Sequence, residues 1–300
     1  MNNEQNRAKT NINWYPGHMA KTKRQIMADL KLVDIVIELL DARIPISSQN
    51  PDIAEITKNK KKIIVLNKCD LADETKNKLW IEKFKKQNIP AVLTDSNTGK
   101  GIEQCIRQIE KIMEQDIKIQ AEKGRIGRKI KAMIIGIPNV GKSSFINRIA
   151  KKASAGVGNT PGFTKQKQWI RINAQIELLD TPGVLWPKFE SEEVALNLAF
   201  TGTIKDDILE KTEIAYHLLK FLLNNYKNLL CERYKLAQNF VNEQLENENR
   251  PENENIYEIF LEIGRKRGCM ISGGNIDEEK TARIILDEFK NGKIGKITLE

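Results

Sequence analysis

Residues 136–143 read Gly-Ile-Pro-Asn-Val-Gly-Lys-Ser and fit the phosphate-loop pattern Gly-x-x-x-x-Gly-Lys-Ser/Thr. Glycines in such a loop let backbone N–H groups turn toward phosphate oxygens, and the following helix adds the positive end of its dipole. Lys142 would reach the β and γ phosphates, and the Ser143 hydroxyl would bind Mg²⁺. The apolar run 131–135 and the helical pattern 144–150 flank the loop, which disfavours the alternative of a glycine-rich turn without a ligand.

A second motif, Asn-Lys-Cys-Asp at 67–70, follows the apolar run 63–66, so it is placed at the carboxyl end of a strand, where α/β sheets bind ligands. The Asp70 carboxylate can accept two hydrogen bonds from the N1–H and N2–H₂ edge of guanine, and adenine has no such donor pair. We therefore predict that the site selects GTP over ATP. Asn67 is expected to hold the loop together, and the stem of Lys68 to lie over the base. A polar turn without a ligand is the alternative.

The order of these two motifs is the reverse of that in an ordinary GTPase, where the phosphate loop comes first. Here the guanine motif at 67–70 precedes the phosphate loop at 136–143. We therefore predict a circularly permuted GTPase domain. The basic stretch 123–129 would be an exposed connector that joins the conventional end of the domain to its conventional start.

Three further segments are expected to complete the site. In Asp-Thr-Pro-Gly at 180–183, Asp180 would hold Mg²⁺ through water and the Gly183 amide would contact the γ-phosphate. Thr164, or alternatively Thr160, would add a hydroxyl to the metal in the triphosphate state. The segment at 96–97 would present backbone amides to guanine O6. The predicted nucleotide contacts are Asn67, Lys68, Asp70, Ser96, Asn97, Asn139, Val140, Gly141, Lys142, Ser143, Ser144, Thr164 and Gly183.

The elements that must position these residues follow from the apolar pattern. Strand-like and helix-like segments alternate up to residue 190, which is typical of an α/β fold with a mostly parallel sheet and helices on both faces. From residue 191 on, only helical patterns occur, with an acidic, asparagine-rich stretch at 242–255 that we predict to be a loop. The sequence therefore predicts a disordered tail at 1–12, a permuted P-loop GTPase domain at 13–190 and a small all-helical domain at 191–300, whose basic residues at 265–267 make RNA a candidate partner.

Several longer segments resemble one family, the permuted GTPases of the ribosome biogenesis GTPase A type. The resemblance covers the chain from about residue 13 to residue 300, and it rests on the motif order and on four segments: 14–20 (Trp-Tyr-Pro-Gly-His-Met-Ala), 41–45 (Asp-Ala-Arg-Ile-Pro), 178–187 and 266–274. It implies a factor that acts late in assembly of the large ribosomal subunit, with GTP hydrolysis stimulated by the ribosomal particle. GTP, GDP, and the rRNA and proteins of that subunit would be its partners.

Two departures from an ordinary GTPase concern hydrolysis. Val184 follows the Asp-Thr-Pro-Gly motif where Ras-like enzymes keep a water-orienting glutamine, and valine cannot orient water. The resemblance implies that His18 takes this catalytic role together with Lys142, although a structural turn residue is the alternative for His18. The other histidine, His217, lies in an apolar run and is expected to pack or to face the surface of a helix. Asn139, inside the phosphate loop, is the second departure: in similar GTPases an asparagine here helps bind K⁺, although capping of the local turn is the simpler explanation.

The composition limits the kinds of partner and compartment that fit this sequence. The chain has 300 residues, 40% hydrophobic content, a net charge of +9 and a pI of about 9.2, which fits a polyanionic partner or a lysine-rich solvated surface. Basic residues at 265–267 and the Ser-Gly-Gly at 272–274 could contact RNA phosphates, or they could complement and cap a helix end. The four cysteines form no Cys-x-x-Cys pair, and no apolar run is long enough to span a bilayer. We expect a cytoplasmic monomer with no membrane partner.

The permutation also predicts how a switch would operate. The loop around Gly183 leads directly into the helical domain, so loss of the γ-phosphate would reorient that domain. GTP would hold the orientation that fits the immature large subunit, and hydrolysis would release the factor. A low-turnover scaffold gated by GTP is the alternative, because Val184 cannot orient water. A GTPase that recruits RNA-modifying or membrane-trafficking partners is a third possibility.

Overall fold

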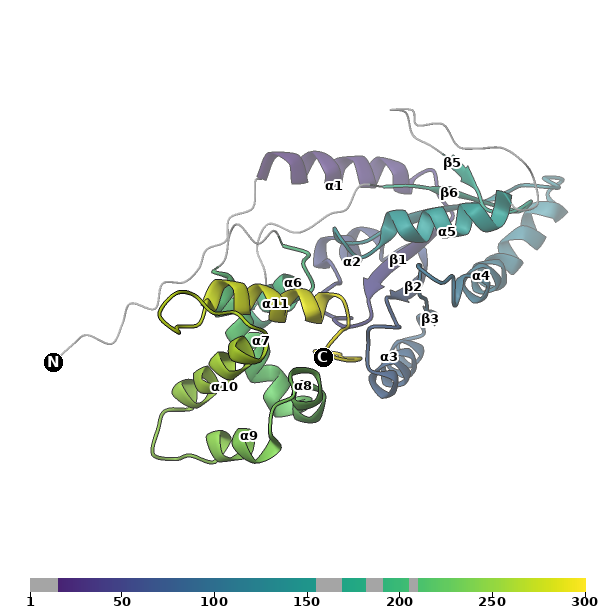
Figure 1. Ribbon diagram of the computed structural model, residues 1–300. Helices are drawn as coiled ribbons and strands as arrows, with labels where there is room; N and C mark the ends of the chain where they lie inside the picture. Colours follow the sequence, from purple (N-terminus) through teal and green to yellow (C-terminus); the bar gives the residue numbers. More distant parts are fainter. Residues whose placement is uncertain (1–15, 155–168, 182–190, 205–209) are drawn as a thin grey trace.

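A computed structural model describes residues 16–154, 169–181, 191–204 and 210–300, with the side chains of 16–20, 22 and 152–154 left out. Its first part, called here the α/β half, is built on a six-stranded sheet of order β3-β2-β1-β4-β6-β5 (Figure 1). All neighbouring strands pair in parallel except β5, which runs antiparallel to β6. The strands are β1 (Ile35–Asp41), β2 (Lys61–Asn67), β3 (Ala91–Leu93), β4 (Ile130–Ile135), β5 (Trp169–Arg171) and β6 (Ile176–Leu179).

Helices cover both faces of this sheet, as the alternation of strand side chains requires. Val36 and Met133 point to the face that carries α1 and α2, and α3 covers the same face further along, over β2. Ile37 and Ile134 point to the opposite face, under α4 and α5. The predicted α/β fold with a mostly parallel sheet is therefore confirmed. These helices are α1 (Pro16–Leu30), α2 (Pro51–Thr57), α3 (Glu74–Lys86), α4 (Ile102–Glu122) and α5 (Lys142–Ser154).

The second part, called here the helical half, has helices and no named strand among its described residues, with one isolated β-bridge between Met270 and Ile276. The helices are α6 (Glu192–Phe200), α7 (Lys211–Asn225), α8 (Lys227–Tyr234), α9 (Gln238–Leu245), α10 (Glu252–Lys266) and α11 (Glu278–Lys290). The predicted loop at 242–255 was wrong at both of its ends, because α9 continues to Leu245 and α10 begins at Glu252. Val241 and Ile256 are buried, so packing in the helical core overrides the polar local composition.

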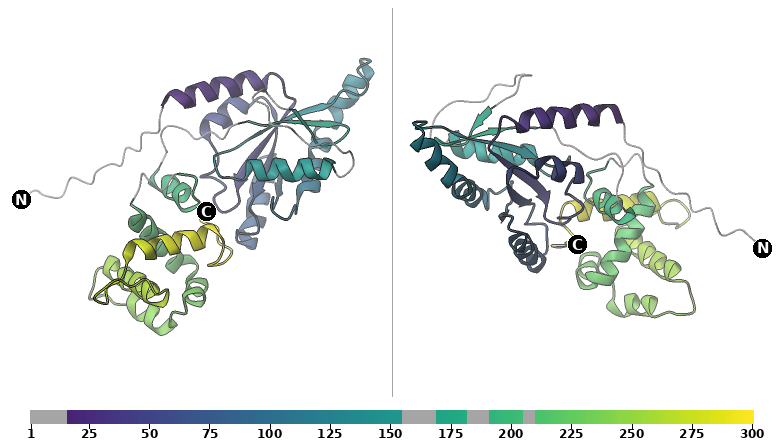
Figure 2. Two further views of the ribbon diagram at one scale, coloured as in Figure 1. Left: turned by 45° about the horizontal axis from the view of Figure 1, so that its top comes forward. Right: turned by 180° about the vertical axis from the view of Figure 1, so that it is seen from behind.

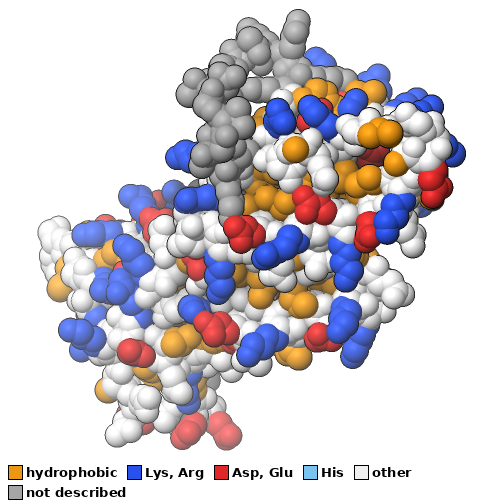
Figure 3. Space-filling model, turned by 90° about the vertical axis from the view of Figure 1, so that its right-hand side faces the viewer, with side chains coloured by type: hydrophobic (Ala, Val, Ile, Leu, Met, Phe, Trp, Pro, Cys, Tyr) orange, Lys and Arg blue, Asp and Glu red, His pale blue; other side chains and the backbone are white. Residues whose placement is uncertain are grey.

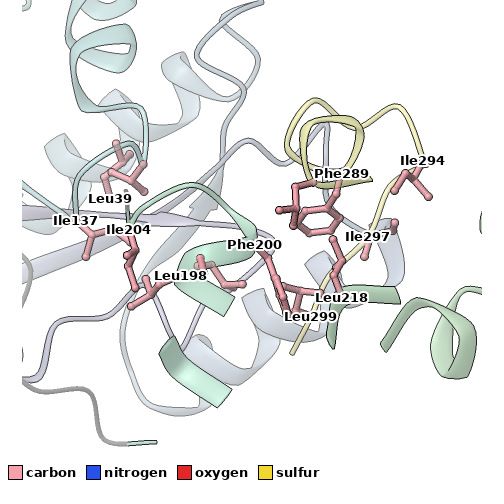
Figure 4. Close-up of a cluster of buried hydrophobic side chains, with 14 of the residues drawn as sticks. Leu39, Ile137, Leu198, Phe200, Ile204, Leu218, Phe289, Ile294, Ile297 and Leu299 are labelled. Carbon is pink, nitrogen blue, oxygen red and sulfur yellow. The ribbon is translucent and has the colours of Figure 1, made fainter. Parts of the chain in front are cut away.

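The two halves share a continuous hydrophobic core. In Figure 4, Leu39 of β1 and Ile137 of the phosphate loop lie against side chains from the end of α6, and the cluster continues toward α11. Because burial of this apolar surface is favourable, the halves are held against each other rather than joined only by a linker. The labelled members from the helical half are Leu198, Phe200, Ile204, Leu218, Phe289, Ile294, Ile297 and Leu299.

Residues 292–300, called here the return segment, run from the end of α11 back over the α/β half, and residue 300 lies close to α3 (Figures 1 and 2). The backbone N–H of Ile297 donates to the carbonyl of Leu71 at 3.0 Å, directly beyond the guanine motif. The Glu300 carboxylate accepts from the backbone N–H of Ile46 at 2.6 Å and from that of Ser47 at 2.9 Å. The return segment therefore fastens the helical half to two loops of the α/β half.

A cavity lies away from these contacts. It has a volume of about 360 Å³ and lies at the amino ends of the parallel strands, between α4 and the connector at 123–129, with Met113, Ile117 and Ile130 among its lining residues. Lysine and arginine side chains are spread over the face drawn in Figure 3 rather than gathered in one patch.

Within the described ranges, no helix has the length and apolar content required to cross a membrane.

Candidate guanine nucleotide site

The carboxyl ends of the parallel strands bring the predicted motifs to one edge of the sheet. Asn67 ends β2, the phosphate loop follows β4, and Asp180 follows β6. Asp41, at the end of β1, lies between the other strand ends, because β1 pairs with both β2 and β4. This edge is where open α/β sheets bind ligands, and it is opposite to the cavity beside the connector.

The phosphate loop touches the guanine motif closely enough to require glycine. Gly141 has φ +99°, and an added Cβ there would lie only 2.4 Å from Asn67 Nδ2. At Gly136 an added Cβ would lie 2.6 Å from the carbonyl oxygen of Leu39. Gly141 is thus needed for the conformation of the loop and for its approach to β2, and Gly136 for the approach of the loop to β1.

Lys142 lies over the phosphate loop at the start of α5. Its Nζ donates to the carbonyl oxygens of Gly136 and Ile137, both at 3.1 Å. Burial lowers the pKa of Lys142 to about 8, against the opposing effect of the nearby Asp180 carboxylate. Ser143 and Ser144 are exposed beside it, and the first turn of α5 carries no acidic residue. A phosphate group would therefore meet a helix N-terminus and a lysine whose charged form it favours.

Asn67 holds the guanine side together. Its Nδ2 donates to the carbonyl of Val140 in the phosphate loop at 2.9 Å. Its Oδ1 accepts from the Ser96 hydroxyl at 2.7 Å, from the Ser96 backbone N–H at 3.2 Å and from the Thr94 hydroxyl at 3.2 Å. One buried side chain thus links three loops, from β2, β3 and β4.

Asp70 presents a carboxylate with an unused acceptor. Among the described residues, its Oδ1 is buried without a hydrogen-bond partner. Burial raises the pKa of Asp70, partly offset by a backbone hydrogen bond. A buried carboxylate oxygen without a donor is costly, and a ligand with paired N–H donors would satisfy it. The guanine edge has that pair of donors.

The contact of the amides at 96–97 with guanine O6 stays a prediction, and both amides have acceptors within the protein. The Ser96 N–H donates to Asn67, and the Asn97 N–H donates to Asp95 Oδ1 at 2.8 Å. Side-chain oxygens only a few ångströms away capture both amides, which a local sequence pattern does not reveal. The Arg148 Nε, from α5, donates to the Ser96 carbonyl at 3.1 Å and fixes this loop from the other side.

Asn139 makes a contact across the two halves. Its backbone has φ +59°, and its Nδ2 donates to the carbonyl of Gly202 at 2.7 Å. Gly202 is the second residue after the end of α6, so the phosphate loop is hydrogen-bonded to the helical half. The sequence offered no signal for this contact, because the two residues are 63 positions apart.

The metal-binding prediction can be tested against the donors that are present. Ser143 offers a hydroxyl oxygen and Asp180 a carboxylate, and burial raises the pKa of Asp180 while Lys142 opposes that effect. Within the described residues, no group of three or more His, Cys, Asp or Glu side chains could hold a metal. Mg²⁺ is commonly held by one or two protein oxygens together with phosphates, so this sparse donor set fits Mg²⁺ bound with a nucleotide.

Several predicted residues cannot be placed in the site. Thr160, Thr164, Gly183 and Val184 lie outside the described residues. His18 lies in the first turn of α1, and its side chain is likewise not described. His217 lies on α7, half-buried beside Tyr216 with 6.2 Å between ring centroids, as expected for a packing residue.

The basic residues at 265–267 have different surroundings. The Arg267 Nη2 donates to Glu288 Oε2 at 3.1 Å, and its guanidinium lies 4.9 Å from the centroid of the Tyr234 ring. Arg265 and Lys266 are exposed and pair with Glu262 on the same helix. Arg267 is therefore part of the internal packing, and the other two remain available at the surface.

Two residues that the sequence analysis gave no role occupy the centre of this edge. Asp41 is buried, and Lys68 Nζ lies 3.0 Å from its Oδ2. Arg43 is buried beside it and pairs with the same carboxylate at 2.8 Å. The signal that could have found Asp41 is its position after an apolar strand, the same position that Asn67 holds in β2.

Sequence comparisons match this chain to known GTPases. A family model described as 50S ribosome-binding GTPase matches residues 131–258. Ribosome biogenesis GTPase A of Bacillus cereus is 45% identical over 289 residues, covering 96% of this chain and 93% of that protein. Mitochondrial ribosome-associated GTPase 1 of Mus musculus is 32% identical, covering 96% of this chain and 89% of that protein.

The fold of this chain also superposes on solved structures of related proteins. GNP-bound YlqF from T. maritima superposes with a TM-score of 0.62 at 28% identity, covering 93% of this chain and 97% of that one. A GDP-bound YlqF structure gives the same TM-score at 27% identity, covering 92% and 98%. The chain therefore belongs to the ribosome biogenesis GTPase A family and is a GTPase whose P-loop domain is circularly permuted.

Proposed function

We propose that this GTPase is an assembly factor that binds the maturing large ribosomal subunit and leaves it when GTP is hydrolysed. The relatives named for ribosome biogenesis and the family model named for 50S ribosome binding support the choice of particle. The observation that carries the guanine site itself is the Oδ1 of Asp70, which has no hydrogen-bond partner among the described residues and lies beyond a motif that Asn67 ties to the phosphate loop.

In this proposal one side of the site binds the guanine base and the other side binds the phosphates. Asp70 accepts from the guanine edge, and the Lys68 stem covers the base. Lys142 and the amides of the phosphate loop hold the β and γ phosphates. The other predicted contacts, at Val140, Gly141, Ser144, Thr164 and Gly183, complete the phosphate side.

GTPases use Mg²⁺, and Ser143 and Asp180 would hold it here, Asp180 through water, with Thr164 joining in the triphosphate state. The ion would neutralise charge that develops between the β and γ phosphates.

Asn139 is proposed to help hold K⁺ through its Oδ1, since its Nδ2 donates to the carbonyl of Gly202. Faster hydrolysis in K⁺ than in Na⁺ supports this role, and equal rates contradict it.

His18 is proposed to orient the attacking water, because Val184 cannot do so. His18 belongs to the first turn of α1. Particle binding would then bring the histidine into the site, which accounts for stimulated hydrolysis. A low-turnover scaffold remains the competing function if no stimulation exists.

Release would follow from the link between the phosphate side and the helical half. Asp180 leads through residues 182–190 to α6, and Asn139 bonds to Gly202 just after α6. Loss of the γ-phosphate would shift these connections and change the surface offered to rRNA, including Arg265 and Lys266. The GTP form should therefore bind the immature subunit more tightly than the GDP form does.

The decisive experiment measures GTP hydrolysis in K⁺ buffer with and without purified large ribosomal subunits. His18→Ala should abolish the stimulation, and His217→Ala is the matched control because His217 packs on α7, away from the sheet edge. Strong stimulation that His18→Ala leaves unchanged contradicts the catalytic role. Tight GTP binding with no stimulation of the wild type supports the scaffold.

The base specificity has its own test. Asp70→Asn replaces an acceptor with a group that can donate, so guanine should lose its advantage over xanthine, whose C2 carbonyl accepts a hydrogen bond. Competition between GDP, XDP and ADP for the wild type and for this variant measures the change. An unchanged preference for GDP in Asp70→Asn contradicts the assignment of Asp70.

A further inference from the structure

A buried carboxylate lies beneath the guanine motif and is shared by two cations. Asp41, the last residue of β1, is 2% exposed. Arg43 donates to it through Nε at 2.9 Å and Nη2 at 2.8 Å, and Lys68 Nζ approaches within 3.0 Å. Burial works to raise the pKa of Asp41, but Arg43 and Lys68 outweigh it and hold the pKa well below its usual range. The carboxylate therefore stays charged and keeps both partners.

The first cation belongs to the guanine motif. Lys68 has φ +58°, and its Nζ also donates to the carbonyl of Asn139 in the phosphate loop at 2.8 Å. Its backbone and its ammonium group are thus both fixed, so the aliphatic stem between them has a defined position. Because that stem is the part proposed to cover the base, Asp41 controls how the lysine meets guanine.

The second cation faces the helical half. Arg43 is 2% exposed, and its Nη1 donates to the carbonyl of Lys290 at the end of α11 at 3.2 Å. Its guanidinium lies 5.6 Å from the centroid of the Phe289 ring, and its backbone carbonyl accepts from Leu299 in the return segment at 2.8 Å. Arg43, two residues beyond the end of β1, is therefore joined to α11 by its side chain and to the return segment by its backbone.

We propose that Asp41 and Arg43 are positioning residues that set Lys68 over the guanine base and make guanine nucleotide affinity depend on how α11 is docked. The path runs from Phe289 and Lys290 through Arg43 and Asp41 to Lys68. This proposal rests on the guanine site proposed above, and it adds a regulation of that site. By thermodynamic reciprocity, whatever holds the helical half in place changes nucleotide affinity by the same factor that nucleotide changes its docking.

A purely structural ion pair makes a different prediction. Removing the contacts of a buried pair destabilises the fold whether or not Lys68 is present. Positioning through Lys68 instead predicts an effect on nucleotide affinity that disappears when the Lys68 ammonium is absent. The two explanations therefore separate in a double-mutant cycle.

The cycle combines Phe289→Leu with Lys68→Met and measures the Kd of GDP by calorimetry on the full chain. Methionine keeps an apolar stem for the base and removes the charge that binds Asp41. Phe289→Leu alone should weaken GDP binding about three- to tenfold, the usual range for coupling between sites. In the Lys68→Met background the same change should alter the Kd by less than about twofold, the usual limit for independent sites.

Phe260→Leu is the matched control, because Phe260 is an equally buried phenylalanine of the helical half on α10. It should lower the melting temperature as Phe289→Leu does and leave the Kd of GDP unchanged. Equal effects of the two phenylalanine variants on the Kd, or equal effects of Phe289→Leu with and without Lys68, overturn the proposal.

Arg43→Lys provides a second route if Phe289→Leu does not fold. Lysine keeps the charge but loses the two-point contact with Asp41, so it should weaken GDP binding only when Lys68 is present. The wild type is titrated first with GDP and ADP. A wild type that does not prefer GDP defeats the proposed guanine site, whereas normal GDP binding without coupling defeats this inference alone.

Discussion

The guanine side and the phosphate side of the site are built differently. On the guanine side, the polar groups around Asp70 largely satisfy one another, whereas Asp70 Oδ1 is left without a partner in the described structure. Asn67 uses both polar atoms of its amide, and the Asp41 carboxylate is held by two cations. On the phosphate side, Lys142 donates to carbonyls of its own loop, and both it and Asp180 have pKa values displaced by burial. Groups on that side must exchange partners when phosphates arrive.

The difference suggests a division of labour. A preformed network favours selectivity, because its geometry does not relax to suit another base. A phosphate side that changes partners favours switching, because a switch needs two arrangements with different affinities for the ligand. The link from Asn139 to Gly202 places the adaptable side in contact with the helical half.

The largest effect should come from the phosphate side. Lys142→Ala removes a partly buried ammonium group that would contact the β and γ phosphates, and truncating such a charged partner costs about 2–5 kcal/mol. GTP affinity, measured by titration, should fall on the order of 100-fold. Lys85→Ala, at a side chain that is 76% exposed, should change nothing. Normal GTP binding by Lys142→Ala would contradict the assignment of Lys142 to the phosphate side.

On the guanine side, Asn67→Ala should reduce stability as well as affinity. It leaves three donors and one carbonyl without their partner, so the free energy of unfolding should fall by about 2–4 kcal/mol. Thr94→Val removes a single donor of that network and should cost about 1 kcal/mol. Denaturant melts measure both. Equal losses for the two variants would mean that Asn67 is not the centre of the network.

A glycine pair tests the contact between the phosphate loop and the helical half. Gly202 has φ +73° and Gly274 has φ +80°, so alanine at either position should cost about 1–2 kcal/mol in the left-handed backbone conformation. An added Cβ at Gly202 would lie 3.3 Å from Lys290 Cε, whereas at Gly274 it would meet nothing within 4 Å. Only Gly202→Ala should also weaken GTP binding, by about twofold. A matching loss in Gly274→Ala would show that the contact with Asn139 carries no nucleotide effect.

An effect smaller than these losses of stability should be a pH dependence of GDP binding that belongs to the phosphate side. Lys142 has a pKa of about 8, and bound phosphates favour its charged form. Below pH 7 the lysine is already protonated, and above pH 8 binding must take up a proton. GDP affinity should therefore fall about fourfold between pH 7 and pH 8.5, with measurable proton uptake. Constant affinity and no proton uptake would contradict the shifted pKa.

Local patterns predicted the strands and the loops that follow them. Apolar runs before residues 67, 136 and 180 specify buried parallel strands, and parallel strands necessarily bring their carboxyl ends together. The proposal that Asp70 reads the base therefore needs only its place after β2. The fold class, the motif order and the family needed no long-range information.

Contacts between distant segments could not be predicted in this way. Helices α8 and α9 have short, polar sequences, and their stability depends on packing in the helical half. The bond from Asn139 to Gly202 and the position of Arg43 under α11 join residues 63 and 247 positions apart. The role of Asp41 was missed for a related reason, since its partner Lys68 is reached across the sheet and not along the chain.

The return segment is made after α11, so its contacts with the guanine side can form only late in translation. Thr298 accepts a hydrogen bond from the backbone of Asp73, 225 residues earlier in the chain. At about 5–20 residues per second, a translating ribosome needs roughly 11–45 seconds to make the intervening chain. During that interval the loop after the guanine motif lacks its cover, so the nascent protein completes its guanine side only after α11 has been made.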